Sequence, residues 1–251
     1  FGGYNIYKEP VDNEKYHNLP QGLRSFLAKL AKAIPFGFKG KNFLIRGAQT
    51  IEERFIGNAY MFSVDERKKL LKVSTPAKAP IALTKPFYDK VKDKSDVTKM
   101  QYLDMHMWLA GDILLKADKM SMAHSLEVRV PFLDKEVFDF AAKLPKEAKI
   151  AAGTTKYIFR KAVSQFIPQE TDKRKKLGFP IPIRVWLRQD DWYQMVKELF
   201  TSKEAEEFFH TDKLLLLLKD HKNKKADNSR KIWTVLTFLI WYDRFFATCS
   251  K

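Results

Sequence analysis

Hydrophobic residues recur at intervals of three and four along most of this chain, the spacing that gathers side chains on one face of an α-helix. Start signals accompany the pattern: Pro20 stands at a first helical position, Ser63 and Glu66 form a capping box, and Asp134 is a helix cap. Together they predict helices over residues 20–34, 63–71, 97–120, 134–144, 155–166, 190–200, 212–219 and 228–246.

The last of these predicted helices, residues 228–246, is apolar on nearly every side. A helix without a polar face is usually buried, so we expect it at the centre of the fold. Period-two alternation is rare by contrast. Residues 126–132 (LEVRVPF) form the one fair strand candidate, and Pro131 ends it. The pattern therefore predicts a mainly α fold with few strands.

Composition indicates a globular chain with a large excess of positive charge. The chain has 251 residues and a mass of 29.4 kDa, enough for one large domain or two small ones, and 45% of the residues are hydrophobic. Lys and Arg number 46 against 30 Asp and Glu, a formal net charge of 46 − 30 = +16. Because the basic blocks are short and scattered, we interpret most of them as solvated surface and expect neither a nucleic-acid nor a membrane partner.

Several classes of protein are excluded. Cys249 is the single cysteine, so there is no internal disulfide framework and no cysteine metal cluster. The longest apolar stretch, residues 232–242, is shorter than the roughly 20 residues that span a bilayer. Glycine-rich nucleotide loops, zinc-protease motifs and serine-hydrolase motifs are absent, and the His residues are dispersed. We therefore predict no metal site.

The first segment that could carry chemistry covers residues 110–134. Asp112 and Lys116 stand four positions apart and so share a helix face, and Glu127 and Arg129 alternate with apolar residues. Each pair is either a surface ion pair worth a few tenths of a kcal/mol or part of a charged functional site. The residues alone leave both interpretations open.

The second segment covers residues 172–187. Arg174, Lys175 and Lys176 precede Gly178, which permits a tight turn, and Pro180, which stiffens the exit. A cationic loop of this kind is either a clamp for phosphate or pyrophosphate or a flexible basic surface loop. Composition does not decide between them.

At these two segments the chain resembles the synthetase domain of glutamine-dependent asparagine synthetases. The run KADKMSMAHSLEVRVPFLD at residues 116–134 is similar to that family's signature. Three more stretches agree in order: FGGYNIY at 1–7, RKKLGFPIPIRVWL at 174–187 and SRKIWTVLTFLIWYDRFF at 229–246. Together the matches extend from one end of the chain to the other.

The resemblance implies a domain assignment. Family members carry a glutaminase domain with an N-terminal Cys, an S-G-G-x-D-S pyrophosphate loop and an acidic G-x-G-A-D-E segment before F-G-G-Y, and none of these is present in residues 1–251. We therefore expect residues 1–251 to be the helical C-terminal part of an α/β, ATP-pyrophosphatase-type (adenine nucleotide α-hydrolase-like) synthetase domain. Taken alone, such a part should bind ATP weakly and make no asparagine.

The resemblance also implies a reaction and site residues. In the family, the side-chain carboxylate of aspartate attacks ATP to give β-aspartyl-AMP, and ammonia then displaces AMP. Lys176 matches the lysine expected to stabilise the phosphates in the transition state, and Asp112 is expected to orient it or to take part in proton transfer. Lys116, Arg129 and Arg174 are the expected substrate- and phosphate-binding residues.

The cofactors and partners that follow are ATP with Mg²⁺, aspartate, glutamine-derived ammonia and an N-terminal glutaminase domain. A homodimer and a cytoplasmic location are further expectations. Two alternatives stay open. A related amidotransferase or β-lactam-synthetase-like enzyme would adenylate another carboxylate, whereas a basic helical RNA-binding module would gather its cations on one face.

Overall fold

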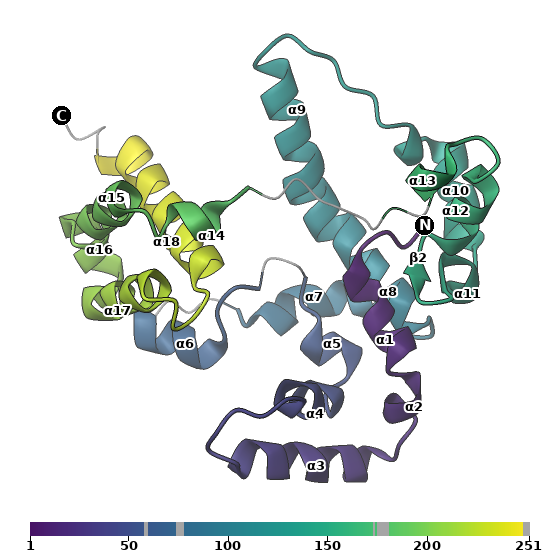
Figure 1. Cartoon of the computed structure of the whole chain (residues 1–251), viewed down its shortest axis with the longest axis horizontal. Coiled ribbons are helices and arrows are strands. Elements are labelled where there is room, and N and C mark those ends of the chain that lie inside the picture. Colours follow the sequence, from purple (N-terminus) through teal and green to yellow (C-terminus); the bar gives the residue numbers. More distant parts are fainter. Residues whose placement is uncertain (58–59, 74–77, 173, 175–180, 248–251) are drawn as a thin grey trace. The chain divides into compact units, whose positions relative to one another are not determined.

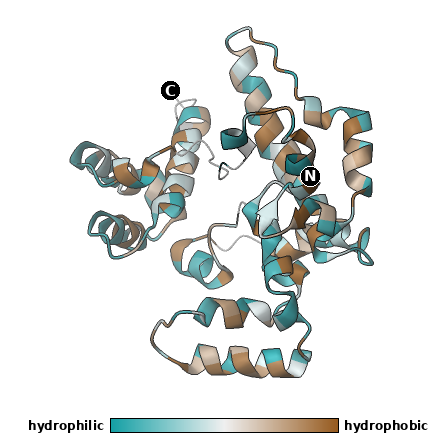
Figure 2. Cartoon of the chain, turned by 45° about the vertical axis from the view of Figure 1, so that its right-hand side comes forward, coloured by the Kyte–Doolittle hydropathy of each residue, from teal (hydrophilic) through white to brown (hydrophobic). Residues whose placement is uncertain are grey.

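The computed structural model describes residues 1–57, 60–73, 78–172, 174 and 181–247, and it is mainly helical (Figure 1). The chain divides into two compact units, each built from two separate stretches of sequence. Unit 1 comprises Phe1–Ala59 and Lys78–Lys175, and unit 2 comprises Tyr60–Ala77 and Lys176–Lys251. Apolar and polar residues are mixed along most of the helices (Figure 2).

Unit 1 is a set of short helices around one long helical run. In chain order its elements are η1 (Asn5–Lys8), α1 (Glu9–Asp12), α2 (Glu14–His17), α3 (Gln21–Ala33), α4 (Lys41–Gly47), α5 (Ile51–Arg54), α7 (Pro80–Asp89), α8 (Asp96–Asp104), η2 (Met105–Leu114), α9 (Leu115–Met122), η3 (Pro131–Leu133), α10 (Lys135–Lys143), α11 (Lys146–Lys149), β1 (Ile150–Ala151), β2 (Thr154–Thr155), α12 (Tyr157–Val163) and α13 (Gln169–Asp172). The run α8–η2–α9 confirms the helix predicted over 97–120, although its middle part is a π-helix.

The core of unit 1 lies where α5, α7 and α8 meet the first turns of the chain. Its buried members are Tyr7, Ile51, Phe55, Tyr88, Val97, Met100, Leu103 and Ile150. Tyr88 donates a hydrogen bond to the carbonyl of Phe55 at 2.5 Å, which joins α7 to the end of α5.

The strand predicted over residues 126–132 is wrong. Residues 126–130 run without strand pairing, and Pro131 opens the short helix η3. The strands described are instead β1 and β2, which pair antiparallel with Ile150 opposite Thr155. Gly153 turns between them with φ +69°. The helix expected to start at Thr155 is also shorter, because Thr155 belongs to β2 and Lys156 precedes α12 with φ +55°.

Unit 2 is a small helical bundle. Its elements are α6 (Val64–Leu70), α14 (Ile183–Trp186), α15 (Asp190–Phe200), α16 (Lys203–Phe208), α17 (Thr211–Lys222), α18 (Ser229–Tyr242) and η4 (Asp243–Ala247). The predicted capping box is present at the start of α6, where Ser63 and Glu66 exchange hydrogen bonds. Two backbone hydrogen bonds, from Lys72 to Phe208 and from His210 to Leu70, join the two stretches of sequence in this unit.

Helix α18 supplies one face of the unit 2 core. Ile232, Val235, Leu236 and Leu239 are buried, and they pack with apolar residues of α6, α15, α16 and α17. The opposite side of the helix is exposed: Trp233, Ile240 and Trp241 keep 39%, 50% and 47% of their surface accessible. The expectation of a central helix is therefore correct for one face only.

Among the described residues, no helix is both long enough and apolar enough to cross a membrane.

Candidate functional site

Asp112 and Lys116, the first predicted site pair, lie together on the long helical run of unit 1. Asp112 belongs to η2 and Lys116 to α9, and the carboxylate and ammonium are 3.6 Å apart. Their side chains are 42% and 61% exposed, so the attraction between them is largely screened by water. The pairing predicted from the spacing is present as an exposed ion pair, and both groups are open to solvent.

Arg129 forms an ion pair with Glu127 in the extended segment that follows α9. The two side chains are 86% and 69% exposed. Of the two interpretations that the sequence leaves open, the geometry matches the exposed pair.

The second predicted segment is described only in part. Arg174 is exposed, and its carbonyl accepts a hydrogen bond from the Arg160 guanidinium at 3.3 Å. Lys176, the predicted catalytic lysine, lies outside the described residues. Asp112 and Lys116 share the long helical run, whereas Arg129 and Arg174 lie on two other exposed stretches. The phosphate site built from these side chains and Lys176 therefore stays a prediction.

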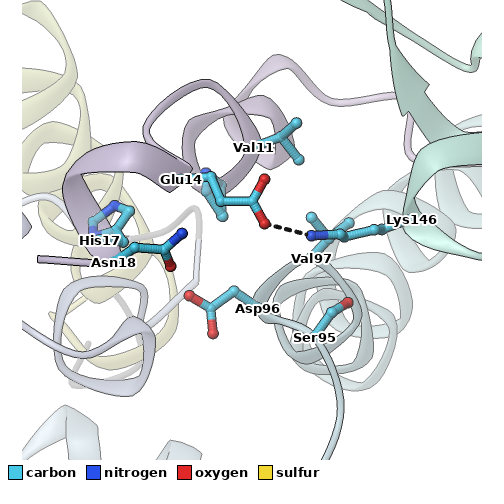
Figure 3. Close-up of a pocket in the computed structure, with 9 residues that line it drawn as sticks. Val11, Glu14, His17, Asn18, Ser95, Asp96, Val97 and Lys146 are labelled. Atoms are coloured by element: carbon cyan, nitrogen blue, oxygen red, sulfur yellow. Dashed lines mark hydrogen bonds and ion pairs between the residues drawn. The ribbon is translucent and has the colours of Figure 1, made fainter.

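Sequence reasoning missed a polar pocket of about 210 Å³ in unit 1 (Figure 3). Its wall consists of Pro10, Val11, Glu14, His17, Asn18, Ser95, Asp96, Val97 and Lys146. Glu14 and Lys146 face each other there at 2.8 Å. This hydrogen bond lowers the pKa of the Glu14 carboxyl and raises the pKa of Lys146. Much of the charge of the pocket is thus already neutralised within the protein.

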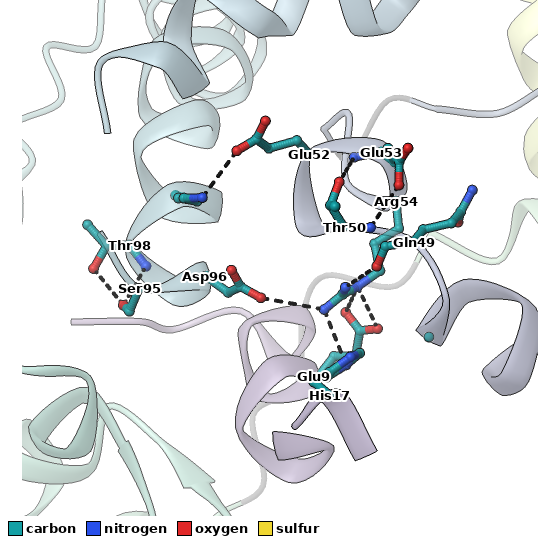
Figure 4. Close-up of polar contacts among 12 residues, drawn as sticks. Glu9, His17, Gln49, Thr50, Glu52, Glu53, Arg54, Ser95, Asp96 and Thr98 are labelled. Carbon is teal, nitrogen blue, oxygen red and sulfur yellow. Dashed lines mark hydrogen bonds and ion pairs between the residues drawn. The ribbon is translucent and has the colours of Figure 1, made fainter. Parts of the chain in front are cut away.

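Arg54 is the centre of a second polar cluster, which adjoins this pocket (Figure 4). Its side chain is only 2% exposed and makes four contacts: Glu9 at 3.2 Å, Asp96 at 3.8 Å, the ring of His17 at 3.3 Å and the carbonyl of Gln49 at 2.9 Å. One guanidinium therefore ties α1, α2 and α8 to α5.

The surroundings of His17 in this cluster favour its neutral form. Burial lowers the pKa of His17 below its ordinary value of 6.5, and the positive charge of Arg54 lowers it further. Neutral imidazole has one ring nitrogen that can accept, and the Arg54 guanidinium donates to it. Because its charges are satisfied internally, this cluster has the character of a structural hub rather than of a reactive centre.

A buried acid lies further along the same unit. Tyr7 donates a hydrogen bond to Asp104 at 2.6 Å, which joins η1 to the end of α8. Burial raises the pKa of Asp104, and burial together with the Asp104 charge raises the pKa of Tyr7. The motif FGGYNIY is thereby fixed against the long helical run.

No group of three or more His, Cys, Asp or Glu side chains in the described part of the chain is arranged to hold a metal ion. We assign no step to a metal bound by these residues.

Comparison with known proteins gives a consistent result. The family model described as "Asparagine synthase" matches residues 1–243. The chain is 48% identical over 242 residues to a glutamine-hydrolysing asparagine synthetase of Bacillus subtilis, and the match covers 96% of this chain and 38% of that relative. A putative asparagine synthetase of Mycobacterium tuberculosis is 41% identical over 245 residues, covering 98% of this chain and 38% of that relative.

More distant matches are shorter. The human glutamine-hydrolysing asparagine synthetase is 34% identical over 88 residues, 34% of this chain and 15% of that relative. The chain thus spans 38% of the length of its more similar curated relatives. No solved structure matches it significantly.

Proposed function

The chain belongs to the asparagine synthase family, and from that membership we propose that it is the carboxyl-terminal part of an ATP-dependent, glutamine-hydrolysing asparagine synthetase. The observation that carries this proposal is the 48% identity to such an enzyme over 96% of the chain. The fold that we propose for the whole synthetase domain is of the ATP-pyrophosphatase type. The mainly helical residues 1–251 would form its later portion.

The proposed reaction joins an adenylation to an aminolysis. An oxygen of the aspartate side-chain carboxylate attacks the α-phosphorus of ATP. The bond from the α-phosphorus to the oxygen of the β-phosphate breaks, pyrophosphate leaves, and β-aspartyl-AMP is formed. Ammonia released from glutamine then attacks the acyl carbon, expels AMP and loses a proton, which leaves asparagine. The Bacillus subtilis relative is named as glutamine-hydrolysing, and a glutaminase part of the complete protein would supply the ammonia. The single cysteine and the use of ATP are consistent with a cytoplasmic reaction.

We propose roles for the site residues on the basis of the matched motifs. Lys176 would stabilise the negative charge that develops on the phosphates, and Asp112 would orient it or accept a proton. Lys116, Arg129 and Arg174 would bind substrate oxygens. Lys116 and Arg129 now pair with exposed carboxylates, and exposed pairs contribute only about 0–1 kcal/mol. Exchanging a carboxylate for a phosphate oxygen therefore costs little.

Product analysis tests the proposal. The complete protein that includes this chain is incubated with ATP, aspartate and glutamine. We expect asparagine, AMP and pyrophosphate in equal amounts, and no product when glutamate replaces aspartate. Formation of ADP and phosphate would contradict adenylation, and a preference for another carboxylic acid would contradict the substrate assignment.

A further inference from the structure

Helix α3 exposes the apolar stripe that its sequence predicts. Leu23, Phe26 and Leu30 are spaced by three and four positions and share one face of the helix. Their exposed fractions are 45%, 57% and 49%, whereas the helix buries the small side chains of Ala28 and Ala31. Ordinary protein surfaces expose large apolar side chains singly and scattered, whereas helix α3 exposes three of them in a row.

The hairpin formed by α3 and α4 is held firmly at its base. The rings of Tyr16 and Phe43 lie 4.7 Å apart, and Gly47 meets the Tyr16 ring so closely that a Cβ there would approach it to 2.4 Å. Both views place the two helices side by side with α3 on the outer edge of unit 1 (Figures 1 and 2). The connecting turn carries Phe36, which is 67% exposed.

Every charged residue of this hairpin is a cation. Residues 21–47 contain six Lys and Arg and no Asp or Glu. Arg24 donates a hydrogen bond to the carbonyl of Gly47, and Lys41 donates to those of Ile34 and Phe36. Four cations are exposed: Lys29, Lys32, Lys39 and Arg46. Lys29 follows Phe26 by three positions and therefore borders the apolar stripe.

We propose that the α3–α4 hairpin binds reversibly to the surface of an anionic phospholipid bilayer. An amphipathic helix with Lys on its polar side and Phe and Leu on the other lies in the plane of such a surface, with the apolar side chains among the acyl chains and the cations at the headgroups. The uniform positive charge opposes pairing with a second copy of the same hairpin. It complements the anionic cytoplasmic leaflet, where each Lys or Arg near the surface contributes about 1 kcal/mol.

The proposal replaces, for this hairpin alone, the expectation that the chain has no membrane partner. It goes beyond the proposed synthetase activity and does not depend on it. Contact with a bilayer surface also needs no membrane-spanning helix.

Vesicle sedimentation of the purified complete protein that includes this chain tests the proposal. Vesicles of phosphatidylcholine mixed with phosphatidylglycerol are compared with vesicles of phosphatidylcholine alone, at low and high salt. We expect binding to the anionic vesicles only, and release at high salt. Lys29→Gln with Lys32→Gln should weaken it by roughly thirtyfold. Phe26→Gln with Leu30→Gln should weaken it by roughly tenfold or more.

Matched controls come from the same unit. Lys92→Gln with Lys94→Gln removes two exposed lysines, and Ile81→Gln with Leu83→Gln removes two apolar residues that are 44% and 51% exposed. Both controls should bind as the unchanged chain does. Equal losses in variant and control, equal binding to neutral vesicles, or no binding at all would overturn the proposal. The proposal would also be overturned if the hairpin variants lost self-association, or binding to an acidic protein, while their binding to vesicles stayed unchanged.

Discussion

At the scale of single residues, charged side chains of unit 1 pair in two ways, either with neighbours on the same stretch of chain or with residues far away in the sequence. The pairs Asp112–Lys116 and Glu127–Arg129 could be read from spacings of four and two, and both are present. Arg54 carried no such signal, because Glu9 and His17 lie 45 and 37 positions away in the chain. Only the packing of α1, α2, α5 and α8 brings them together.

The neutral state of His17 predicts a pH dependence of stability. The folded chain holds the pKa of His17 below the value of 6.5 that the unfolded chain has, so the unfolded state binds the proton first as the pH falls. Above pH 6.5, His17 should contribute no pH dependence to the free energy of unfolding. Below pH 6.5, the free energy of unfolding should decrease as the pH falls, until the pH is lower than the pKa that His17 has in the folded chain. His17→Asn should reduce this decrease in urea titrations over that range.

His124→Asn is the matched control, since His124 is exposed in the turn after α9. The raised pKa of Asp104 acts in the opposite direction at lower pH, because protonation then favours the folded state, and comparing the variants cancels its contribution. An unchanged pH profile in His17→Asn would contradict the assignment of a neutral, hydrogen-bonded His17.

Lys176 is the residue on which the proposed chemistry depends most. In the complete protein, Lys176→Ala should slow pyrophosphate release in a single turnover by roughly a hundred- to a thousandfold, the usual effect of losing one preorganised charge at a developing anion. Aspartate binding should change much less, because the cation acts mainly on the transition state. Lys175→Ala is the control and should stay within about a few-fold of the unchanged protein. Equal losses at both positions would mean that only the general charge of the loop matters.

At the scale of elements, helices were predictable because their three-to-four period and their caps are local properties. The predicted strand over 126–132 failed for a related reason: alternation favours a strand only where a partner strand accepts its hydrogen bonds, and residues 126–130 have no such pairing. Strands β1 and β2 are only two residues long each, which is too short to show an alternation of apolar and polar residues. The spacing of apolar residues predicted a helix across Met105–Leu114, but it did not indicate the π-helical hydrogen bonding of η2.

Helix α18 offers a stability test within one element. Ile232 is fully buried and Ile240 is 50% exposed on the same helix. Ile232→Ala should lower the free energy of unfolding by about 2–5 kcal/mol, because it removes buried methyl groups and leaves a cavity. Ile240→Ala should cost less than about 1 kcal/mol. Urea denaturation of both variants is the measurement, and equal losses would contradict the one-sided burial of α18.

At the scale of the whole molecule, sequence order alone did not reveal the division into units. Residues 60–77 belong with residues 176–251, although more than 90 residues of unit 1 separate them in the chain. The link depends on contacts such as the ion pair between Glu66 and Lys231, which are 165 positions apart. The family resemblance, by contrast, could be recognised from the sequence, because its motifs are runs of adjacent residues. The matching family model and the similar relatives confirm it.

In the proposed reaction, an oxygen of the aspartate side chain attacks the α-phosphorus of ATP. Isotope labelling can follow this oxygen: aspartate labelled with ¹⁸O in its side-chain carboxylate is turned over by the complete protein with ATP and glutamine. We expect each AMP formed to carry one labelled oxygen in its phosphate, because ammonia displaces AMP together with the attacking oxygen. Unlabelled AMP, or label in inorganic phosphate with ADP as the product, would rule out this adenylation.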